Sequence, residues 1–223
     1  MNGILYGVGV GPGDPELITV KALKIIRRTE VLAVPDTSTA YEIAAQAVDL
    51  RGKELLQLHL PMTKDPLTLH NSHDLAAETV KSKLQAGYDV AFLTLGDPSI
   101  YSSYLYIQQR VAEAGYETCM AEGITSFCAA AARLNMPLCE GEQALHIIPV
   151  NYTGTDYLQW QGTKVLMKPG KDFNSIREKL RQSGHIDKTV MIERCGMEGE
   201  RIYPRLEDAE GDKSYFTLII VKE

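Results

Sequence analysis

Strand and helix patterns alternate through the first 120 residues, and this alternation limits the fold more than any other feature of the chain. Each short apolar run is followed by a longer stretch with apolar residues at helical spacing. Repeated strand–helix units of this kind predict a mostly parallel sheet with helices on both faces. The expected strands lie at 4–10, 31–34, 54–60, 90–95 and 116–120, and the expected helices at 16–28, 41–49, 69–85 and 100–113.

The rest of the chain has a different rhythm, because strand candidates outnumber helix candidates. A mixed or antiparallel sheet fits that ratio better than a purely parallel one. We therefore predict an N-terminal α/β domain over residues 1–120 and a C-terminal mixed α/β domain over residues 121–223. The expected helices lie at 126–134 and 173–182, and the expected strands at 145–150, 165–168, 189–194, 201–204 and 215–221.

The composition excludes several classes of partner. With 23 basic and 29 acidic residues, the chain carries a net charge of −6 and has no basic stripe, which argues against nucleic acid. No apolar run approaches the roughly 20 residues that a helix needs to cross a bilayer. The N-terminus has no signal-peptide pattern, so we expect a cytoplasmic protein with no membrane partner.

The sequence gives little support for a metal site. The four cysteines form no Cys-x-x-Cys pair, so we expect free thiols rather than a zinc site. His70, His73 and Asp74 share one expected helix and could form a metal pair, but a solvent-facing polar helix face explains them better. We therefore predict no resident metal.

Two expected strand-to-helix turns share a Gly-Asp-Pro tripeptide. One is centred on Asp14 and the other on Asp97. Aspartate suits the N-cap of a helix, proline suits its first position, and glycine lets a ligand approach the backbone. Both turns follow strands of the expected parallel sheet, and ligands of such sheets bind beyond the carboxyl ends of the strands. Either turn alone could be purely structural, but the pair favours a binding site.

The residues of the first turn limit the kind of ligand. The glycine run fails the GxGxxG spacing of dinucleotide-binding turns, and the chain has no GxxxxGK[ST] phosphate loop. Asp14 and Glu16 open the expected helix and would repel a phosphate there. A phosphate-free ligand with positive charge fits better, and S-adenosylmethionine, with its sulfonium and ammonium groups, is one such molecule.

Three segments resemble the motifs of one enzyme family. They are GVGVGPGDPELITVKA at 7–22, GDP at 96–98, and EGITSF at 122–127 followed by AAAAR at 129–133. In sequence and spacing they are similar to the tetrapyrrole (class III) methyltransferases, which use S-adenosylmethionine. Three stretches resemble the members that methylate carbon 20 of precorrin-2 or cobalt-precorrin-2 in cobalamin biosynthesis: LTLGDPSIYS at 93–102, SFCAAAARL at 126–134 and MEGERIY at 197–203.

The resemblance implies a structure and a set of cofactor contacts. It implies a tetrapyrrole methylase fold of two domains, a cofactor cleft between them and a homodimer that acts on a small-molecule tetrapyrrole. The contact near Cys195 departs from the Asn-Gly of related members. The implied contacts to S-adenosylmethionine, or to its product S-adenosylhomocysteine, are Pro12, Leu95, Gly96, Asp97, Ile100, Thr125, Ser126, Met167, Cys195 and Gly196.

The implied reaction asks little of side-chain chemistry. An electron-rich ring carbon attacks the sulfonium methyl group in line, so proximity and orientation supply most of the rate. The sequence offers no candidate catalytic base. Asp97 and the turn carbonyls are our hypothesised partners for the cofactor ammonium, and the carboxylate arms of the substrate call for cations. The substrate-binding candidates are Tyr101, Arg133, Lys168, Arg194 and Arg201.

Other functions stay open at this point. One is a sister methyltransferase that acts at another position of the ring or, more remotely, on diphthine or ribosomal RNA. Another is a non-catalytic nucleotide-binding module, which would bind phosphate-bearing nucleotides and transfer no methyl group. The sequence does not tell whether the ring arrives with or without cobalt.

Overall fold

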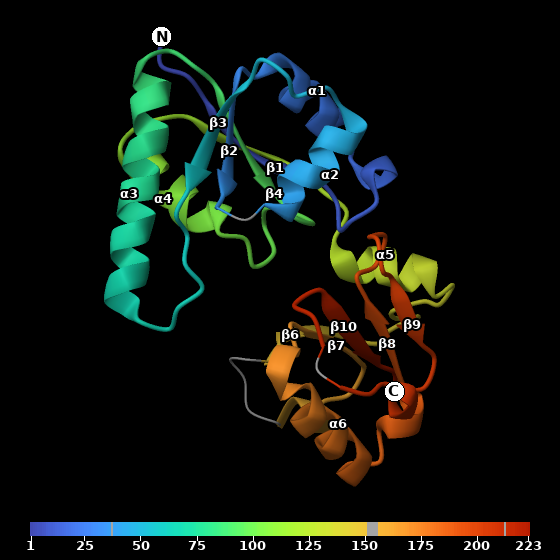
Figure 1. The fold of residues 1–223 in the computed structure, drawn as a ribbon. Helices are drawn as coiled ribbons and strands as arrows, with labels where there is room; N and C mark the ends of the chain where they lie inside the picture. Colours follow the sequence, from blue (N-terminus) through green and yellow to red (C-terminus); the bar gives the residue numbers. More distant parts are fainter. Residues whose placement is uncertain (37, 151–155, 212) are drawn as a thin grey trace. The chain divides into compact units, whose positions relative to one another are not determined.

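The chain folds into two compact units. The computed structural model describes residues 1–36, 38–150, 156–211 and 213–223 (Figure 1). Unit 1 comprises Met1–Thr125 and unit 2 comprises Ser126–Glu223, so the division falls after residue 125 rather than after residue 120. The reason is that the residues just after the last strand of unit 1 still contact that unit, as the next subsection describes.

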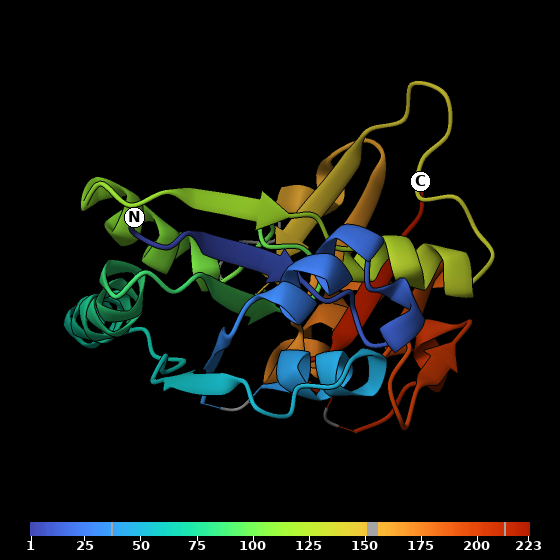
Figure 2. The same ribbon diagram turned by 90° about the horizontal axis from the view of Figure 1, so that it is seen from above.

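Unit 1 is built on a parallel sheet of five strands in the order β3-β2-β4-β1-β5. All four strand pairings are parallel, as predicted (Figure 2, where β1 and β5 run side by side in the same direction). The strands are β1 Leu5–Gly9, β2 Val31–Pro35, β3 Glu54–Leu58, β4 Val90–Thr94 and β5 Thr118–Ala121; the α-helices are α1 Val20–Arg28, α2 Thr39–Ala47, α3 Pro66–Gln85 and α4 Tyr104–Glu113.

The helices cover both faces of this sheet. α3 and α4 lie together on one face, and α1 and α2 lie on the other (Figure 1). The core beneath α3 and α4 combines apolar residues of the strands, such as Val31 and Phe92, with Ala77 of α3 and Tyr104 of α4. Apolar residues on both sides of each central strand explain why these strands read as unbroken apolar runs.

Two helices begin later than the sequence predicted, because hydroxyl groups rather than the Gly-Asp-Pro aspartates precede them. Asp14 caps only a short 3-10 turn, Pro15–Leu17, and α1 starts after Thr19, whose hydroxyl accepts the N–H of Ala22. The residues after Asp97 likewise form a turn. α4 starts at Tyr104, whose N–H donates to the Ser102 hydroxyl at 3.2 Å. The expected starts at residues 16 and 100 were therefore wrong.

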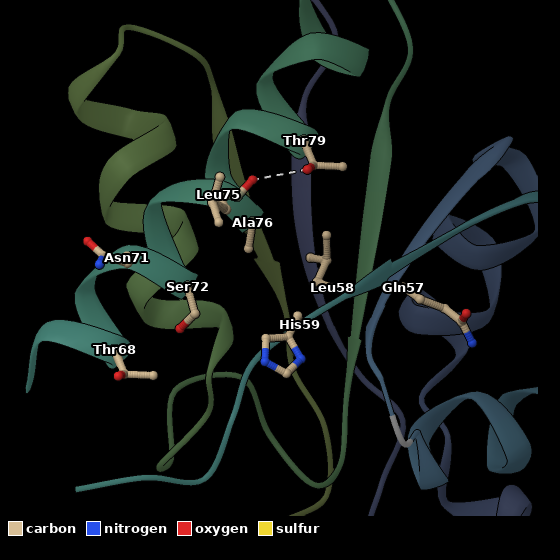
Figure 3. Close-up of a pocket in the computed structure, with 9 residues that line it drawn as sticks. All are labelled: Gln57, Leu58, His59, Thr68, Asn71, Ser72, Leu75, Ala76 and Thr79. Carbon is tan, nitrogen blue, oxygen red and sulfur yellow. Dashed lines mark hydrogen bonds between the residues drawn. The ribbon is translucent and has the colours of Figure 1, made fainter. Parts of the chain in front are cut away.

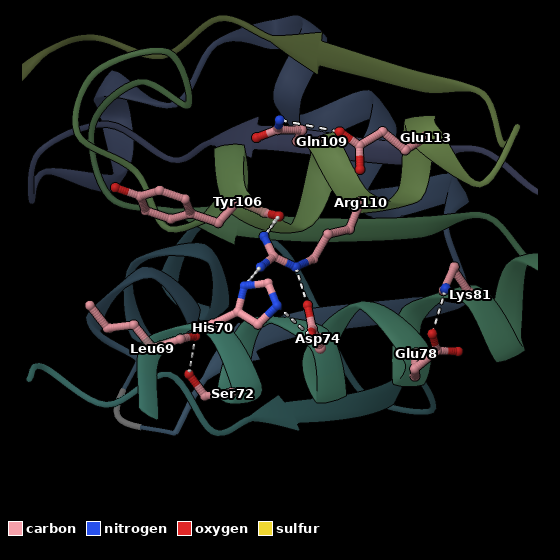
Figure 4. Close-up of polar contacts among 10 residues, drawn as sticks. All are labelled: Leu69, His70, Ser72, Asp74, Glu78, Lys81, Tyr106, Gln109, Arg110 and Glu113. Carbon is pink, nitrogen blue, oxygen red and sulfur yellow. Dashed lines mark hydrogen bonds and ion pairs between the residues drawn. The ribbon is translucent and has the colours of Figure 1, made fainter. Parts of the chain in front are cut away.

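A charged network joins α3 to α4 (Figure 4). Arg110 Nε lies 2.6 Å from Asp74 Oδ1, and Arg110 Nη2 lies 3.2 Å from His70 Nδ1. The hydrogen bond from Arg110 holds the pKa of Asp74 below its usual value. The prediction that His73 faces solvent was wrong. His73 is buried and stacks on Tyr106 with ring centroids 4.6 Å apart. In the described part of the chain, no helix is long and apolar enough to cross a membrane.

Unit 2 contains a mixed sheet of five strands in the order β6-β7-β10-β8-β9. β6 and β7 are parallel, and the other three pairings are antiparallel, as predicted for this half. α6 packs on one face over a core that includes Leu166, Met191 and Ile219. The elements are α5 Ser126–Arg133, β6 Leu145–Pro149, β7 Thr163–Met167, α6 Phe173–Gln182, β8 Thr189–Glu193, β9 Arg201–Tyr203 and β10 Thr217–Val221.

Candidate functional site

The two Gly-Asp-Pro turns meet at the carboxyl edge of the unit 1 sheet. β1 and β4 are neighbours, so the turns that follow them touch through an isolated bridge between Gly11 and Gly96, with Gly96 N–H donating to Gly11 O at 2.7 Å. The connection from β1 leads to β2 on one side, and the connection from β4 leads to β5 on the other. Such a topological switch point is where open parallel sheets bind ligands.

A third segment, Glu122–Thr125, packs backbone against backbone onto these turns. A Cβ atom added to Gly123 would lie 1.9 Å from Gly96 O, and one added to Gly9 would lie 2.5 Å from the same oxygen. Only glycine permits this approach, and Gly96 also needs a positive φ of 71°. Sequence reasoning assigned no role to Gly123, although its place at the start of the third motif was a signal.

Asp97 fastens the second turn to this third segment. Its Oδ2 accepts the Gly123 N–H at 2.8 Å, while Oδ1 accepts the N–H and the hydroxyl of Ser99. Partial burial raises the pKa of Asp97, but the hydrogen bonds from Ser99 and Gly123 outweigh it and leave the pKa below its ordinary value. Asp97 is therefore ionised at neutral pH and places a negative charge at this edge.

The first motif contacts the same segment from the other side. The Thr19 hydroxyl donates to Glu122 O at 3.1 Å, and Lys21 Nζ lies 2.8 Å from Glu122 Oε2. This pair is exposed, so it contributes little stability. It does show that residues about 100 positions apart in the sequence meet at one place.

The predicted cofactor contacts of unit 1 lie on these joined segments. Pro12 and Gly96 are buried in the two turns, and Leu95 and Ile100 are half-buried beside them. The Thr125 hydroxyl is buried and has no hydrogen-bond partner in the described part of the chain. A buried unpaired hydroxyl is unfavourable, so a ligand that bonds to it would remove the cost. Ionised Asp97 and the unpartnered Thr125 hydroxyl fit a cationic, phosphate-free cofactor.

Replacing Thr125 by valine should weaken cofactor binding without destabilising the fold. Valine has nearly the shape of threonine, and removing an unpaired buried hydroxyl is close to neutral for stability. We expect the Kd for S-adenosylhomocysteine, measured by calorimetry, to rise about threefold to tenfold, the worth of one neutral hydrogen bond. The matched control is Thr29→Val at the end of α1, which removes another buried hydroxyl of unit 1 with no hydrogen-bond partner among the described residues. Equal Kd values for both variants would contradict a role for Thr125.

The predicted contacts of unit 2 gather at one edge of its own sheet. β7 and β8 both run antiparallel to β10, so their carboxyl ends lie at the same edge. Met167 ends β7 and Cys195 follows β8, while Arg201 pairs with Glu193 across that edge. Lys168 Nζ lies 5.0 Å from the centre of the Tyr215 ring, just before β10. The sheet thus collects Met167, Lys168, Arg194, Cys195, Gly196 and Arg201.

Three of the five substrate-binding candidates have left-handed backbones. Tyr101, Lys168 and Arg194 have φ values of 49°, 60° and 55°, and the only other non-glycine residue of this kind in the described ranges is Asn135. Such conformations cost of order 1–3 kcal/mol and concentrate at functional sites. Arg133 is instead paired with Glu200, through Nε at 2.7 Å. Each of these substrate assignments stays a prediction.

A separate pocket of about 450 Å³ lies between the end of β3 and α3 (Figure 3). Its walls combine apolar Leu58 and Leu75 with amide and hydroxyl groups, and they contain no lysine or arginine. His59 lines it and pairs with Asp36 through Nδ1 at 2.6 Å. None of the predicted contacts belongs to this pocket. Across the described residues, no cluster of His, Cys, Asp or Glu side chains could hold a metal ion.

Comparison with known proteins identifies the class that this fold and these turns define. Residues 4–210 match the family model "Tetrapyrrole (Corrin/Porphyrin) Methylases", and the chain belongs to that family. It is an S-adenosylmethionine-dependent C-methyltransferase of tetrapyrroles, which agrees with the resemblance of the motifs and sets aside a non-catalytic nucleotide-binding module.

Its relatives within the family carry more specific names. The chain is 34% identical to the probable cobalt-precorrin-2 C(20)-methyltransferase of Methanocaldococcus jannaschii, over 98% of this chain and 95% of that one. It is 31% identical to the cobalt-precorrin-2 C(20)-methyltransferase of Salmonella typhimurium, over 100% of this chain and 98% of that one. The fold matches that of uroporphyrin-III C-methyltransferase from Thermus thermophilus complexed with S-adenosylhomocysteine, with a TM-score of 0.73 at 21% identity. The match covers 99% of this chain and 92% of that one.

Proposed function

We propose that this chain methylates carbon 20 of precorrin-2 or cobalt-precorrin-2 in cobalamin biosynthesis. The observation that carries the proposal is the match, along essentially the whole length of both chains, to relatives named for that reaction. The stretches 93–102, 126–134 and 197–203, which resemble C20-methylating enzymes, add to it. They lie at the second turn, in α5 and in the loop that leads into β9, three of the places where the predicted contacts gather.

In this proposal the residues of the joined turns hold the methyl donor. S-adenosylmethionine, when bound, supplies an electrophilic methyl group on its sulfonium. Pro12, Leu95, Gly96 and Ile100 line the backbone surface that receives it, and the Thr125 hydroxyl supplies one directed hydrogen bond. The charge of Asp97 complements the positive donor, although its oxygens already accept protein hydrogen bonds, so its main task is to fix the turn.

The remaining assignments concern the substrate and unit 2. Ser126 opens α5, and Met167, Cys195 and Gly196 stand at the sheet edge as further contacts to the cofactor. Lys168, Arg194 and Arg201 supply cations at that edge for the carboxylate arms of the ring, with Tyr101 and Arg133 as further candidates. A homodimer and a cytoplasmic location stay predictions from the sequence.

A methylation assay tests the proposed function. The purified chain, kept free of oxygen, is given precorrin-2 or cobalt-precorrin-2 together with S-adenosylmethionine labelled with carbon-13 in its methyl group. We expect one methyl group to be transferred and NMR to place the label on carbon 20. A label on another ring carbon would assign the chain to a sister methyltransferase, and no transfer to either ring would reject the proposal. Comparing the two rings also decides whether cobalt enters before this step.

A further inference from the structure

A carboxylate closes the loop between β8 and β9. Gly196 N–H donates to Glu200 Oε2 at 2.8 Å, and Met197 N–H donates to Arg194 O at 2.9 Å. Arg194 Nε also donates to Glu198 O, four residues further along the loop, at 2.7 Å. The Glu200 side chain is only 16% exposed, although residues 198 and 199 beside it face solvent. The segment 194–200, here called the β8–β9 loop, is thus closed by hydrogen bonds among its own residues, one of them to the Glu200 carboxylate.

The same carboxylate ties this loop to α5. Its Oε1 lies 2.7 Å from Arg133 Nε, in the last turn of that helix. Burial raises the pKa of Glu200, but the hydrogen bonds from Gly196 N–H and Arg133 outweigh it and hold the pKa below its ordinary value. Glu200 is therefore a charged acceptor that binds two segments at once. One contains Cys195 and Gly196, and the other begins at Ser126.

The hydrogen bond to Glu200 also sets the orientation of one peptide group. The peptide bond between Cys195 and Gly196 is trans, because no described peptide bond is cis. In a trans peptide the N–H and the C=O point in opposite directions. Since the N–H of Gly196 is directed at Glu200, the carbonyl of Cys195 is directed away from that carboxylate. The positive φ of Gly196, 72°, is a conformation that glycine adopts easily.

We propose that Glu200 is a positioning residue for the methyl donor. By holding the Gly196 N–H, it makes the loop present the Cys195 carbonyl, an acceptor, to a hydroxyl or amine group of the cofactor. By holding Arg133, it keeps α5 and its first residue in a fixed relation to that carbonyl. This inference rests on the proposed assignment of Cys195, Gly196 and Ser126 as cofactor contacts, and sequence reasoning did not point to Glu200.

The test compares three variants by calorimetry with S-adenosylhomocysteine. Glu200→Ala removes both hydrogen bonds. We expect Kd to rise about tenfold, because a hydrogen bond to a charged group that fixes a cofactor contact is then lost. Glu200→Gln keeps one acceptor for the Gly196 N–H, so it should recover most of the affinity. The matched control, Glu207→Gln, breaks the 2.6 Å pair between Glu207 and Arg181 on α6 and should leave Kd unchanged.

A second readout separates positioning from simple stability. Trp160 is the only tryptophan of the chain and lies in unit 2, so its fluorescence follows the unfolding of that unit. A positioning role predicts a higher KM for S-adenosylmethionine in Glu200→Ala, with kcat changed less than twofold. A lower unfolding midpoint with unchanged Kd and KM would overturn the inference alone. Absence of S-adenosylhomocysteine binding by the wild-type chain would overturn the cofactor assignment itself, and this inference with it.

Discussion

Replacing Gly123 by alanine is expected to lower the affinity for S-adenosylhomocysteine by about 100-fold or more. The added methyl group would lie 1.9 Å from Gly96 O and 2.9 Å from Gly9 Cα, and both neighbours are backbone atoms that cannot rotate away. The second turn must then move by about an ångström. A misplacement of that size costs roughly 100-fold in rate at a catalytic site, and we expect a loss of the same order in cofactor affinity. Overpacking of this kind also destabilises a fold by about 1–3 kcal/mol.

The matched control for this variant is Gly52→Ala. Gly52 has a φ of 80° and nothing within 4 Å of an added Cβ, so alanine there strains the backbone without pushing a neighbour. We expect a stability loss of about 1–2 kcal/mol from the left-handed conformation and no change in cofactor affinity. Calorimetric titration and thermal unfolding of both variants separate the two effects. Wild-type affinity in Gly123→Ala would show that the packed turns do not hold the cofactor.

Replacing Asp97 by asparagine should produce the second largest effect. Asparagine can keep the hydrogen bond from Ser99 N–H, but its amide nitrogen cannot accept from Gly123 N–H. Losing a hydrogen bond to a charged acceptor costs about 1.5–3 kcal/mol of stability. We expect cofactor affinity to fall about tenfold, because Glu122–Thr125 is then no longer fastened to the second turn. Asp14→Asn, in the other Gly-Asp-Pro turn, is the control. Among the described residues the side chain of Asp14 accepts the Glu16 N–H alone, and asparagine retains that bond.

The effect of Asp97→Asn should depend on pH in a defined direction. The folded-state pKa of Asp97 lies below its ordinary value of 3.8, so its ionised form stabilises the fold at pH values above 3.8. That contribution is lost as the pH falls through the folded-state pKa. Urea unfolding should therefore show a large difference between wild type and variant at pH 7 and a smaller one below pH 3.8. A difference independent of pH would contradict the role of the charge.

The architecture of unit 1 could be predicted because its sequence pattern is local. Residues 90–95 form an apolar run bounded by Gly87 and Gly96, and burial on both sides requires such a run wherever the strand sits in the sheet. The helix starts could not be predicted from the Gly-Asp-Pro turns. Ser102, whose hydroxyl lies 2.8 Å from that of Thr94, accepts the first N–H of α4, and nothing in the local sequence favours it over Asp97.

The candidate site was predictable only as far as its motifs. The resemblance supplied the contact residues, but it gave no reason for the aspartate of the second motif. The structure supplies one, because Asp97 and Gly123 are 26 residues apart and meet only after β5 has joined the sheet beside β1. Glu200 was equally hidden, since its partners are Gly196 nearby and Arg133, which is 67 residues away. Contacts between distant segments follow from topology rather than from local pattern.

A crystal structure of the chain with S-adenosylhomocysteine tests the central claim most directly. We expect the ligand against the glycine backbones of the two turns, with a hydrogen bond to the Thr125 hydroxyl and the Asp97–Gly123 contact intact. A ligand bound in the pocket between β3 and α3, or at any place that leaves Gly96 and Thr125 untouched, would contradict it.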